Sequence, residues 1–314
     1  MEVFEVVQPG LLTTVQDLGR KGYQQYGVPT SGALDDYAFR VGNILVGNNE
    51  DAASLEITLF GCQLRVLQGT TIAITGADLV PKINGAHASN WESIRVKRGD
   101  VLSFPQLNSG CRAYLAVAGG ICVPRVMRSA STYVRAGIGG LFGRSLRKGD
   151  ILQANDNPSS CTGARVPSET IPVYGNQITL RTILGPQDDY FTEQGIHTFL
   201  NSKYTVTSKA DRMGYCLDGP SIQHKAEADI ISDGIPLGAI QVPGDGLPII
   251  LLADRQTTGG YTKIGTTISV DISRVAQAKP GDSIRFERVD EEEAVTLLFE
   301  YERQMALMKS HLHA

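Results

Sequence analysis

Glycine is frequent in this chain, and its distribution restricts the folds that the chain can adopt. The 34 glycines of 314 residues exceed the average usage of about 7%. They separate short apolar runs, and few stretches carry the periodicity of a long helix. Strand-like runs occupy residues 71–75, 101–104, 113–117, 178–184, 204–207, 249–252 and 283–286. This pattern predicts a mainly β architecture with a few helices.

A Gly-Asp pair precedes a predicted strand at three places, within residues 98–104, 148–152 and 280–286. Glycine followed by aspartate is a common turn sequence before a strand. The repetition suggests two related β units, and its irregular spacing excludes a solenoid.

Two segments have helical periodicity. The first aligns Leu34, Tyr37, Ala38, Val41, Ile44 and Leu45 on one face and stops at residues 47–49. The second begins at Asp290, with Glu293 three residues later as in a capping box. Its apolar stripe, which we expect to be core or a subunit contact, comprises Ala294, Leu297, Leu298, Tyr301, Met305 and Met308.

The length allows two domains. A polar, proline-bearing stretch at 155–169 separates strand signals, and we expect the boundary there. The predicted limits are 1–157 for the first domain, 168–289 for the second, and 290–314 for a C-terminal helix and tail.

Composition excludes several classes of partner. The chain is 42% hydrophobic and 20% charged, and its net charge of −4 offers no basic excess for nucleic acid or an anionic membrane. No apolar run approaches a membrane span in length, and the first residues lack a signal-peptide pattern. We therefore expect a cytoplasmic protein.

The cysteines and histidines do not suggest a metal site. The cysteines are odd in number and form no C-x-x-C pair: Cys62, Cys111, Cys122, Cys161 and Cys216. The histidines are scattered or terminal: His87, His197, His224, His311 and His313. We predict reduced, mostly buried thiols and no structural metal.

One segment, 253–261, follows the apolar run 248–252 with a carboxylate, a guanidinium, an amide, two hydroxyls and two glycines. Such polar groups at the end of a buried strand are typical of a binding loop. Related combinations of Asp, Arg, Gly and Tyr occur at 210–215 and 13–23, so the three segments could converge on one cleft. In the alternative, Asp254 and Arg255 form a local ion pair and the two glycines make a hairpin turn.

Several enzyme motifs are missing. The sequence has no G-x-x-x-x-G-K-[ST] phosphate loop, no G-x-S-x-G and no H-E-x-x-H. The glycine-rich stretch 137–143 lacks the dinucleotide-binding spacing, and a connector is its simpler interpretation.

Longer motifs resemble a known family. Residues 10–20, 27–35, 113–121, 232–243 and 253–261 are similar to the KipA family, also called allophanate hydrolase subunit 2 or the biotin-dependent carboxyltransferase-like family. The resemblance extends from about residue 7 to about 286. It implies two cyclophilin-like β-barrel domains with a groove between them.

The resemblance also implies a function. A chain of this kind is expected to be the C subunit of an ATP-dependent 5-oxoprolinase, which is a cytoplasmic hetero-oligomeric hydrolase that opens the cyclic amide 5-oxoproline to L-glutamate. Its partners would be one KipI-like protein and one LamB/YcsF-like protein. The alternatives are a regulator that antagonises a KipI-like kinase inhibitor, or a carboxyltransferase-like subunit served by a biotin carrier.

Cofactors follow from the same comparison. Residues 306–309 weakly resemble a biotin-acceptor sequence, but they lie at the end of a predicted helix. An acceptor lysine is presented on a hairpin, so we expect no covalent biotin. The complex would use ATP, whose binding site the sequence does not locate.

Lactam opening requires groups that hold a carboxylate, a lactam N–H and a developing oxyanion. The predicted catalytic residues are Asp254, Arg255, Gln256, Asp211 and Arg212. The predicted substrate-binding residues are Gln16, Asp17, Arg20, Gln241, Thr257, Thr258, Gly259, Gly260 and Tyr261.

Overall fold

The computed structural model describes residues 1–156 and 162–312, which divide into two compact units. Unit 1 comprises Met1–Arg20, Ser31–Tyr174 and Gln304–Ala314, and unit 2 comprises Lys21–Thr30 and Gly175–Arg303. The domain limits expected from the sequence stay a prediction. Cys161, His313 and part of the expected boundary lie outside the described residues.

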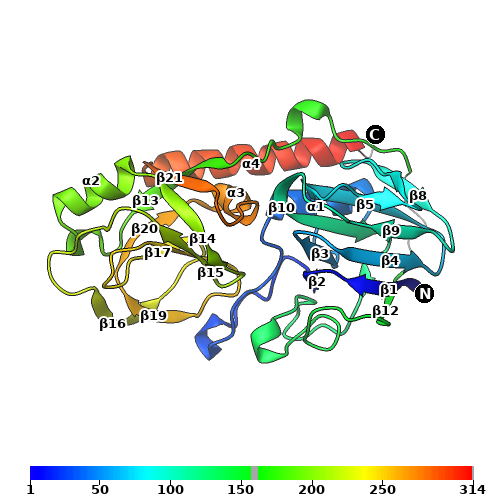
Figure 1. Ribbon diagram of the computed structural model, residues 1–314, viewed down its shortest axis with the longest axis horizontal. Coiled ribbons are helices and arrows are strands. Elements are labelled where there is room, and N and C mark those ends of the chain that lie inside the picture. The colour runs from blue at the N-terminus through cyan, green and yellow to red at the C-terminus, as the bar shows by residue number, and fades with distance from the viewer. Residues whose placement is uncertain (157–161, 313–314) are drawn as a thin grey trace. The chain divides into compact units, whose positions relative to one another are not determined.

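The described strands of unit 1 form two antiparallel sheets (Figure 1). The seven-stranded sheet has the order β11-β12-β1-β4-β9-β6-β7, and the five-stranded sheet has the order β2-β3-β10-β5-β8. The first sheet contains β1 Glu2–Pro9, β4 Cys62–Val66, β6 Lys82–Ile83, β7 Ala86–His87, β9 Val101–Ser103, β11 Ile121–Cys122 and β12 Ile151–Ala154. The second contains β2 Leu12–Gln16, β3 Ser54–Thr58, β5 Thr70–Asp78, β8 Ser93–Val96 and β10 Ser109–Val117.

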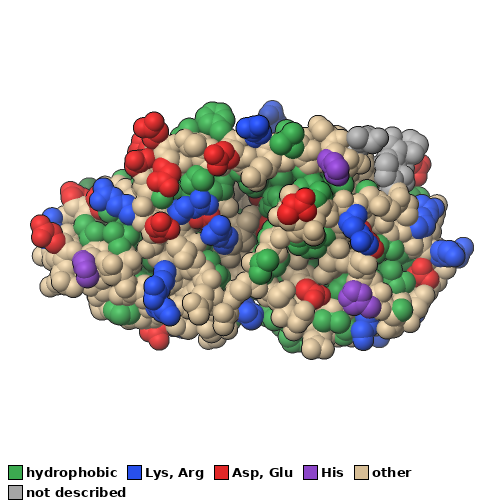
Figure 2. All heavy atoms as spheres, turned by 90° about the horizontal axis from the view of Figure 1, so that it is seen from above, with side chains coloured by type: hydrophobic (Ala, Val, Ile, Leu, Met, Phe, Trp, Pro, Cys, Tyr) green, Lys and Arg blue, Asp and Glu red, His purple; other side chains and the backbone are tan. Residues whose placement is uncertain are grey.

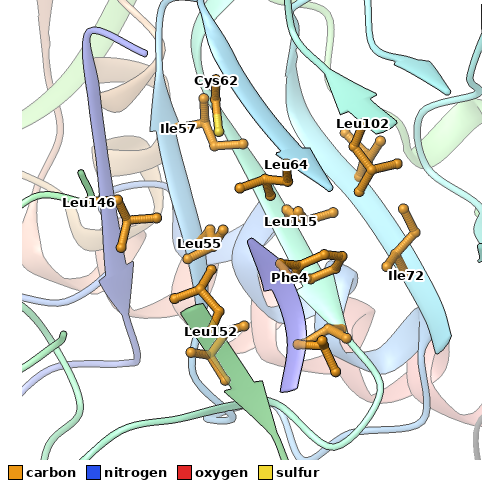
Figure 3. Close-up of a cluster of buried hydrophobic side chains, with 14 of the residues drawn as sticks. Phe4, Leu55, Ile57, Cys62, Leu64, Ile72, Leu102, Leu115, Leu146 and Leu152 are labelled. Carbon is orange, nitrogen blue, oxygen red and sulfur yellow. The ribbon is translucent and has the colours of Figure 1, made fainter. Parts of the chain in front are cut away.

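The core of unit 1 combines side chains from both sheets (Figure 3). Phe4, Leu64 and Leu102 come from the seven-stranded sheet, and Leu55 and Leu115 come from the five-stranded sheet. All five are fully or almost fully buried. Alternation along each strand places these apolar residues on the inner face of its sheet.

Helix α1, Asp36–Leu45, contacts strands β5 and β10. The Asp35 side chain accepts a hydrogen bond from the Ala38 N–H at 3.0 Å, as an N-cap residue does. The helix buries Val41 and Ile44, which belong to the apolar stripe expected from the sequence. The prediction of this helix is confirmed.

The described strands of unit 2 form a closed barrel with the order β13-β20-β17-β18-β15-β14-β21. Strands β13 and β21 close it through a parallel pairing. The barrel contains β13 Gln177–Leu184, β14 Tyr204–Ala210, β15 Gly214–Asp218, β17 Ala239–Gln241, β18 Ile249–Leu251, β20 Lys263–Thr267 and β21 Ser283–Arg288. The expectation of a mainly β fold is confirmed, with a closed barrel in unit 2 and two sheets among the described strands of unit 1.

A separate two-stranded ribbon pairs β16, Asp229–Gly234, with β19, Thr258–Tyr261. Unit 2 also contains α2, Glu193–Asn201, and α3, Ile272–Ala276, two short helices that the sequence pattern did not predict. Short helices carry too few turns to display a clear period.

Helix α4, Glu291–Leu312, begins as predicted. The Asp290 carboxylate accepts a hydrogen bond from the Glu293 N–H at 2.8 Å. Met305 and Met308 are buried, whereas Leu298 is 40% exposed, so the expected stripe is narrower than predicted. No described helix is both long enough and apolar enough to cross a membrane.

The three Gly-Asp turns share one geometry. In each, the aspartate side chain accepts a hydrogen bond from the backbone N–H three residues earlier, and the glycine has a positive φ of 86–93°. The turns are Lys97–Asp100, Arg147–Asp150 and Lys279–Asp282. Each is joined by two backbone hydrogen bonds to a strand valine, namely Val66, Val6 and Val206. The repetition seen in the sequence is therefore structural and occurs in both units.

The described surface is mixed in charge. Figure 2 shows acidic, basic and apolar side chains interspersed over the face that it views. None of the four described cysteines is in a disulfide; Cys62 and Cys111 are buried and Cys122 is exposed.

Replacing Leu64 with Ala should destabilise unit 1 by about 2–5 kcal/mol, because the change leaves a cavity between the sheets. Trp91, the chain's one tryptophan, is buried in unit 1, so its fluorescence during urea unfolding reports on this unit. Leu11→Ala, at a side chain that is 64% exposed, is the control and should shift the midpoint little. Equal shifts for both variants would contradict the assigned core.

The thiol of Cys62 should resist alkylation. Burial raises its pKa to about 12, so almost none of it is thiolate at pH 8. With iodoacetamide at pH 8, peptide mapping should find Cys122 modified and Cys62 unmodified until urea unfolds unit 1. Reaction of Cys62 in the folded chain at the rate of Cys122 would refute this assignment.

Candidate functional site

The polar segment 253–261 leads from barrel strand β18 into ribbon strand β19. After Leu252, whose carbonyl oxygen accepts a hydrogen bond from the Arg255 N–H at 3.1 Å, the chain turns. Gly259 and Gly260 then lie inside β19. The alternative in which these glycines form a hairpin turn is therefore wrong.

Asp254 forms a buried ion pair with Arg212. The Arg212 Nε donates to Asp254 Oδ2 at 3.0 Å, and its Nη2 donates to Oδ1 at 3.3 Å. The two side chains are 6–7% exposed, and the Asp254 N–H also donates to the Arg212 carbonyl oxygen at 2.9 Å. The structure thus brings together the 210–215 and 253–261 segments. The alternative in which Asp254 pairs with Arg255 is therefore wrong, because Arg212 comes from the β14–β15 turn beside the end of β18.

Arg255 is buried without a carboxylate partner among the described residues. Its Nε donates to the Ile235 carbonyl oxygen at 2.9 Å, and its Nη1 donates to the Leu252 carbonyl oxygen at 3.1 Å. Burial lowers the pKa of this guanidinium to about 10. A desolvated cation with only neutral acceptors is well suited to bind an anion.

Asp211 lies on the surface in the turn between β14 and β15. Its Oδ1 accepts hydrogen bonds from the backbone N–H groups of Met213 at 2.7 Å and Gly214 at 3.2 Å. This is the arrangement by which aspartate stabilises a turn. Asp211 is therefore close to Arg212 in the chain but does not share its ion pair.

The ribbon packs closely against Gln241. A Cβ atom added at Gly259 would lie 2.9 Å from the Gln241 Nε2 and 2.7 Å from the Ile235 Cδ1, so a larger residue there would have to displace these side chains. Gln241 is buried, and its Nε2 donates to the Tyr261 carbonyl oxygen at 3.4 Å. The side chains of the remaining predicted residues of this segment are exposed or half-buried: Gln256, Thr257, Thr258 and Tyr261.

Sequence reasoning missed Lys263, the first residue of β20. Its side chain is 1% exposed, and its Nζ donates to Asp233 Oδ2 at 3.2 Å. The available signal was a lysine just after 253–261, before the β-branched stretch Ile264-Gly265-Thr266-Thr267-Ile268. Its partner lies 30 residues away, in the 232–243 motif, so the pairing itself had no local signal.

The predicted residues near the N-terminus form a second cluster within unit 1. The Asp17 carboxylate accepts hydrogen bonds from Ser129 Oγ at 2.7 Å, Ser131 Oγ at 2.5 Å, the Ala130 N–H at 2.6 Å and the Gly19 N–H at 2.8 Å. Four donors satisfy both oxygens of a buried carboxylate. Asp17 therefore holds the 129–131 segment in place.

Arg20 and Gln16 extend this cluster. The Arg20 Nη2 donates to the Ser131 carbonyl oxygen at 2.5 Å, and the Gln16 Nε2 donates to Thr14 Oγ1 at 2.9 Å. Gly139, from the glycine-rich connector, approaches so closely that a Cβ there would lie 2.7 Å from Arg20 Nη2. Gln16, Asp17 and Arg20 thus lie together in unit 1, and a single cleft formed by all three segments stays a prediction.

The described residues contain no candidate metal site, and a cavity in unit 1 lies apart from the predicted site residues. No group of three or more His, Cys, Asp or Glu side chains in the described ranges is arranged to hold a metal ion. A cavity of about 490 Å³ in unit 1 is lined in part by Asn48, Asp51, Cys122 and Arg125, and by no predicted site residue.

Asp254→Asn should destabilise unit 2 by about 3 kcal/mol, because the change removes the charged carboxylate of a buried, hydrogen-bonded ion pair. Hydrogen–deuterium exchange of peptides covering β15 and β18 should accelerate in this variant. Asp211→Asn is the matched control, since asparagine also stabilises such a turn at an exposed position. Faster exchange in the Asp211→Asn control, or unchanged exchange in Asp254→Asn, would contradict the stabilising role of the ion pair.

Comparisons with known proteins support one family. A family model described as "Carboxyltransferase domain, subdomain A and B" matches residues 26–288. The chain is 36% identical over 312 residues to the 5-oxoprolinase C subunit of Escherichia coli, and the match covers 99% of both chains. It is also 36% identical to the 5-oxoprolinase C subunit of Haemophilus influenzae, over 90% of each chain.

A solved structure agrees with these sequence relatives. The crystal structure of the K. lactis urea amidolyase superposes with a TM-score of 0.92 and 34% identity. The match covers 98% of this chain and 20% of that enzyme. This chain belongs to the carboxyltransferase-domain family that comprises subdomains A and B.

Proposed function

We propose that the chain is the C subunit of an ATP-dependent 5-oxoprolinase, which converts 5-oxoproline to L-glutamate. The match to the E. coli protein along almost the whole of both chains carries this proposal. The urea amidolyase match, by contrast, involves one fifth of a much larger enzyme.

The chemistry of unit 2 is compatible with such a substrate. 5-Oxoproline carries a carboxylate, and a planar guanidinium can bind a carboxylate through two parallel hydrogen bonds. Arg255 is our candidate for this contact, because it is a buried cation whose described partners are two carbonyl oxygens. Asp254, which is paired with Arg212, is the candidate to accept from the lactam N–H or to orient water.

The remaining chemistry is assigned to partners. Activation of a lactam carbonyl by ATP requires a nucleotide site, and this sequence contains no phosphate loop. We therefore assign ATP binding to the complex, with one KipI-like protein and one LamB/YcsF-like protein as the partners.

A carboxyltransferase is the second candidate, favoured by the description of the matching family and by the urea amidolyase fold. In that case the chain would receive the carboxybiotin arm of another protein, and the carboxyl group would pass from biotin to an acceptor substrate. Activity would then depend on a biotinylated carrier.

Reconstitution tests these candidates. The chain is mixed with its candidate KipI-like and LamB/YcsF-like partners, and 5-oxoproline-dependent ATP hydrolysis and glutamate release are measured while each protein is omitted in turn. The proposal expects activity only with all three. If the chain binds the KipI-like partner but no glutamate forms, the regulatory alternative is favoured, and a need for a biotinylated carrier favours the carboxyltransferase.

Arg255→Ala should lower kcat/KM of the complex about 100-fold, equivalent to about 2.7 kcal/mol, by removing the proposed carboxylate contact. Arg285→Ala, at an exposed position of β21 in the same unit, is the control and should leave activity unchanged. Circular dichroism checks that both variants fold. Wild-type turnover by a folded Arg255→Ala variant would refute the assignment.

A further inference from the structure

Lys263 is a buried cation that the proposed reaction does not yet use. It begins strand β20, and its relative exposure is 0%. Removing an ammonium group from water is unfavourable by several kcal/mol unless an anion compensates it. Lysine at this position therefore implies a compensating negative charge.

The anion that compensates Lys263 lies at the surface. Asp233 Oδ2 is 3.2 Å from the Lys263 Nζ, yet the Asp233 side chain is 55% exposed. In the parts of the chain that the structure describes, no other carboxylate contacts this ammonium. The pKa of Asp233 is lowered by a hydrogen bond from the Gly234 N–H and then by Lys263, so Asp233 is ionised at neutral pH. A carboxylate at this exposure can leave the ammonium and return to water.

Strand β16, which carries Asp233, is largely exposed to solvent. Asp233 lies opposite Gly259 in the two-stranded β16–β19 ribbon, and most of β16 is exposed, with Ile231 at 94%. Isolated two-stranded ribbons are marginally stable. The Gln187 side chain contacts both partners: its Oε1 accepts from the Lys263 N–H at 3.1 Å, and it hydrogen-bonds Asp233.

Further polar groups surround the pair. Gln241 is the register partner of Lys263 across β17 and β20, and it is 2% exposed. Arg255 is bonded through its Nε to the carbonyl oxygen of Ile235, two residues beyond Asp233. The segment 233–235 is thus flanked by two buried cations, Lys263 and Arg255, and contributes one carboxylate. An added anion would balance these charges.

We infer that Lys263 is an anion receptor whose ammonium group is paired with Asp233, and that a carboxylate or phosphoryl group of a ligand displaces Asp233. Gly259 keeps the space beside Gln241 open, since a side chain there would meet the amide. Naming 5-oxoproline as the ligand rests on the proposed function, whereas the anion site itself does not.

Direct binding to the full-length chain tests this inference. Ligand-observed NMR is carried out with two probes, 5-oxoproline and inorganic phosphate. Asp233→Asn removes the competing charge and should tighten anion binding about 5-fold or more, because the receptor is no longer occupied. Asp229→Asn changes an exposed acid of the same ribbon strand and should leave affinity unchanged. Lys263→Met should abolish binding.

The outcomes are distinct. Binding of 5-oxoproline alone identifies a substrate carboxylate, and binding of phosphate alone identifies a phosphoryl group. If neither probe binds wild type or Asp233→Asn, or if Asp233→Asn and Asp229→Asn change affinity equally, the inference is overturned. The Asp233→Asn arm decides the matter even where Lys263→Met fails to fold. Binding with this pattern, but no glutamate from the reconstituted complex, would refute the proposed function and leave the anion site standing.

Discussion

The buried ion pair between Arg212 and Asp254 fixes the part of unit 2 on which the candidate site depends. It joins the β14–β15 turn to the chain just beyond β18, and a backbone hydrogen bond between the same residues reinforces it. From there Arg255 enters the interior and bonds the carbonyl oxygen of Ile235, at the end of the β16 side of the ribbon. Loss of the Arg212–Asp254 ion pair would therefore disturb the hydrogen bond from Arg255 to Ile235, because Asp254 and Arg255 are adjacent in the chain.

Unit 2 buries three cations, and each is compensated differently. Arg212 has a buried carboxylate, Arg255 has carbonyl oxygens, and Lys263 has a carboxylate at the surface. A buried charge with a buried partner is satisfied and resists change, since separating them leaves both unpaired. The cations without such a partner keep a capacity for external anions. This difference, rather than the mere presence of charge, distinguishes a binding group from a structural one.

Local patterns predicted the fold well. The Gly-Asp turns, helix α1 and the start of α4 follow from residues within a few positions of one another, and the structure confirms each of them. The pairings of the candidate site are different in kind. Asp254 bonds a residue 42 positions away, and Lys263 bonds one 30 positions away. Sequence neighbours do not reveal such pairings, and the adjacent Arg255 was therefore a misleading candidate partner for Asp254. The helical pattern also did not predict that Leu298 is exposed. Periodicity shows which residues share a face of a helix but not which neighbours cover that face.

The Asp17 cluster of unit 1 and the Lys263–Asp233 pair of unit 2 differ in how fully the charged group is satisfied by buried partners. In unit 1, Asp17 accepts four hydrogen bonds from groups of its own unit, an arrangement that positions the 129–131 segment and leaves the carboxylate little capacity for a ligand. In unit 2, Lys263 contacts one carboxylate, and that carboxylate faces water. A buried cation can exchange a carboxylate that lies at the surface for another anion. The released carboxylate is solvated by water and therefore loses little free energy.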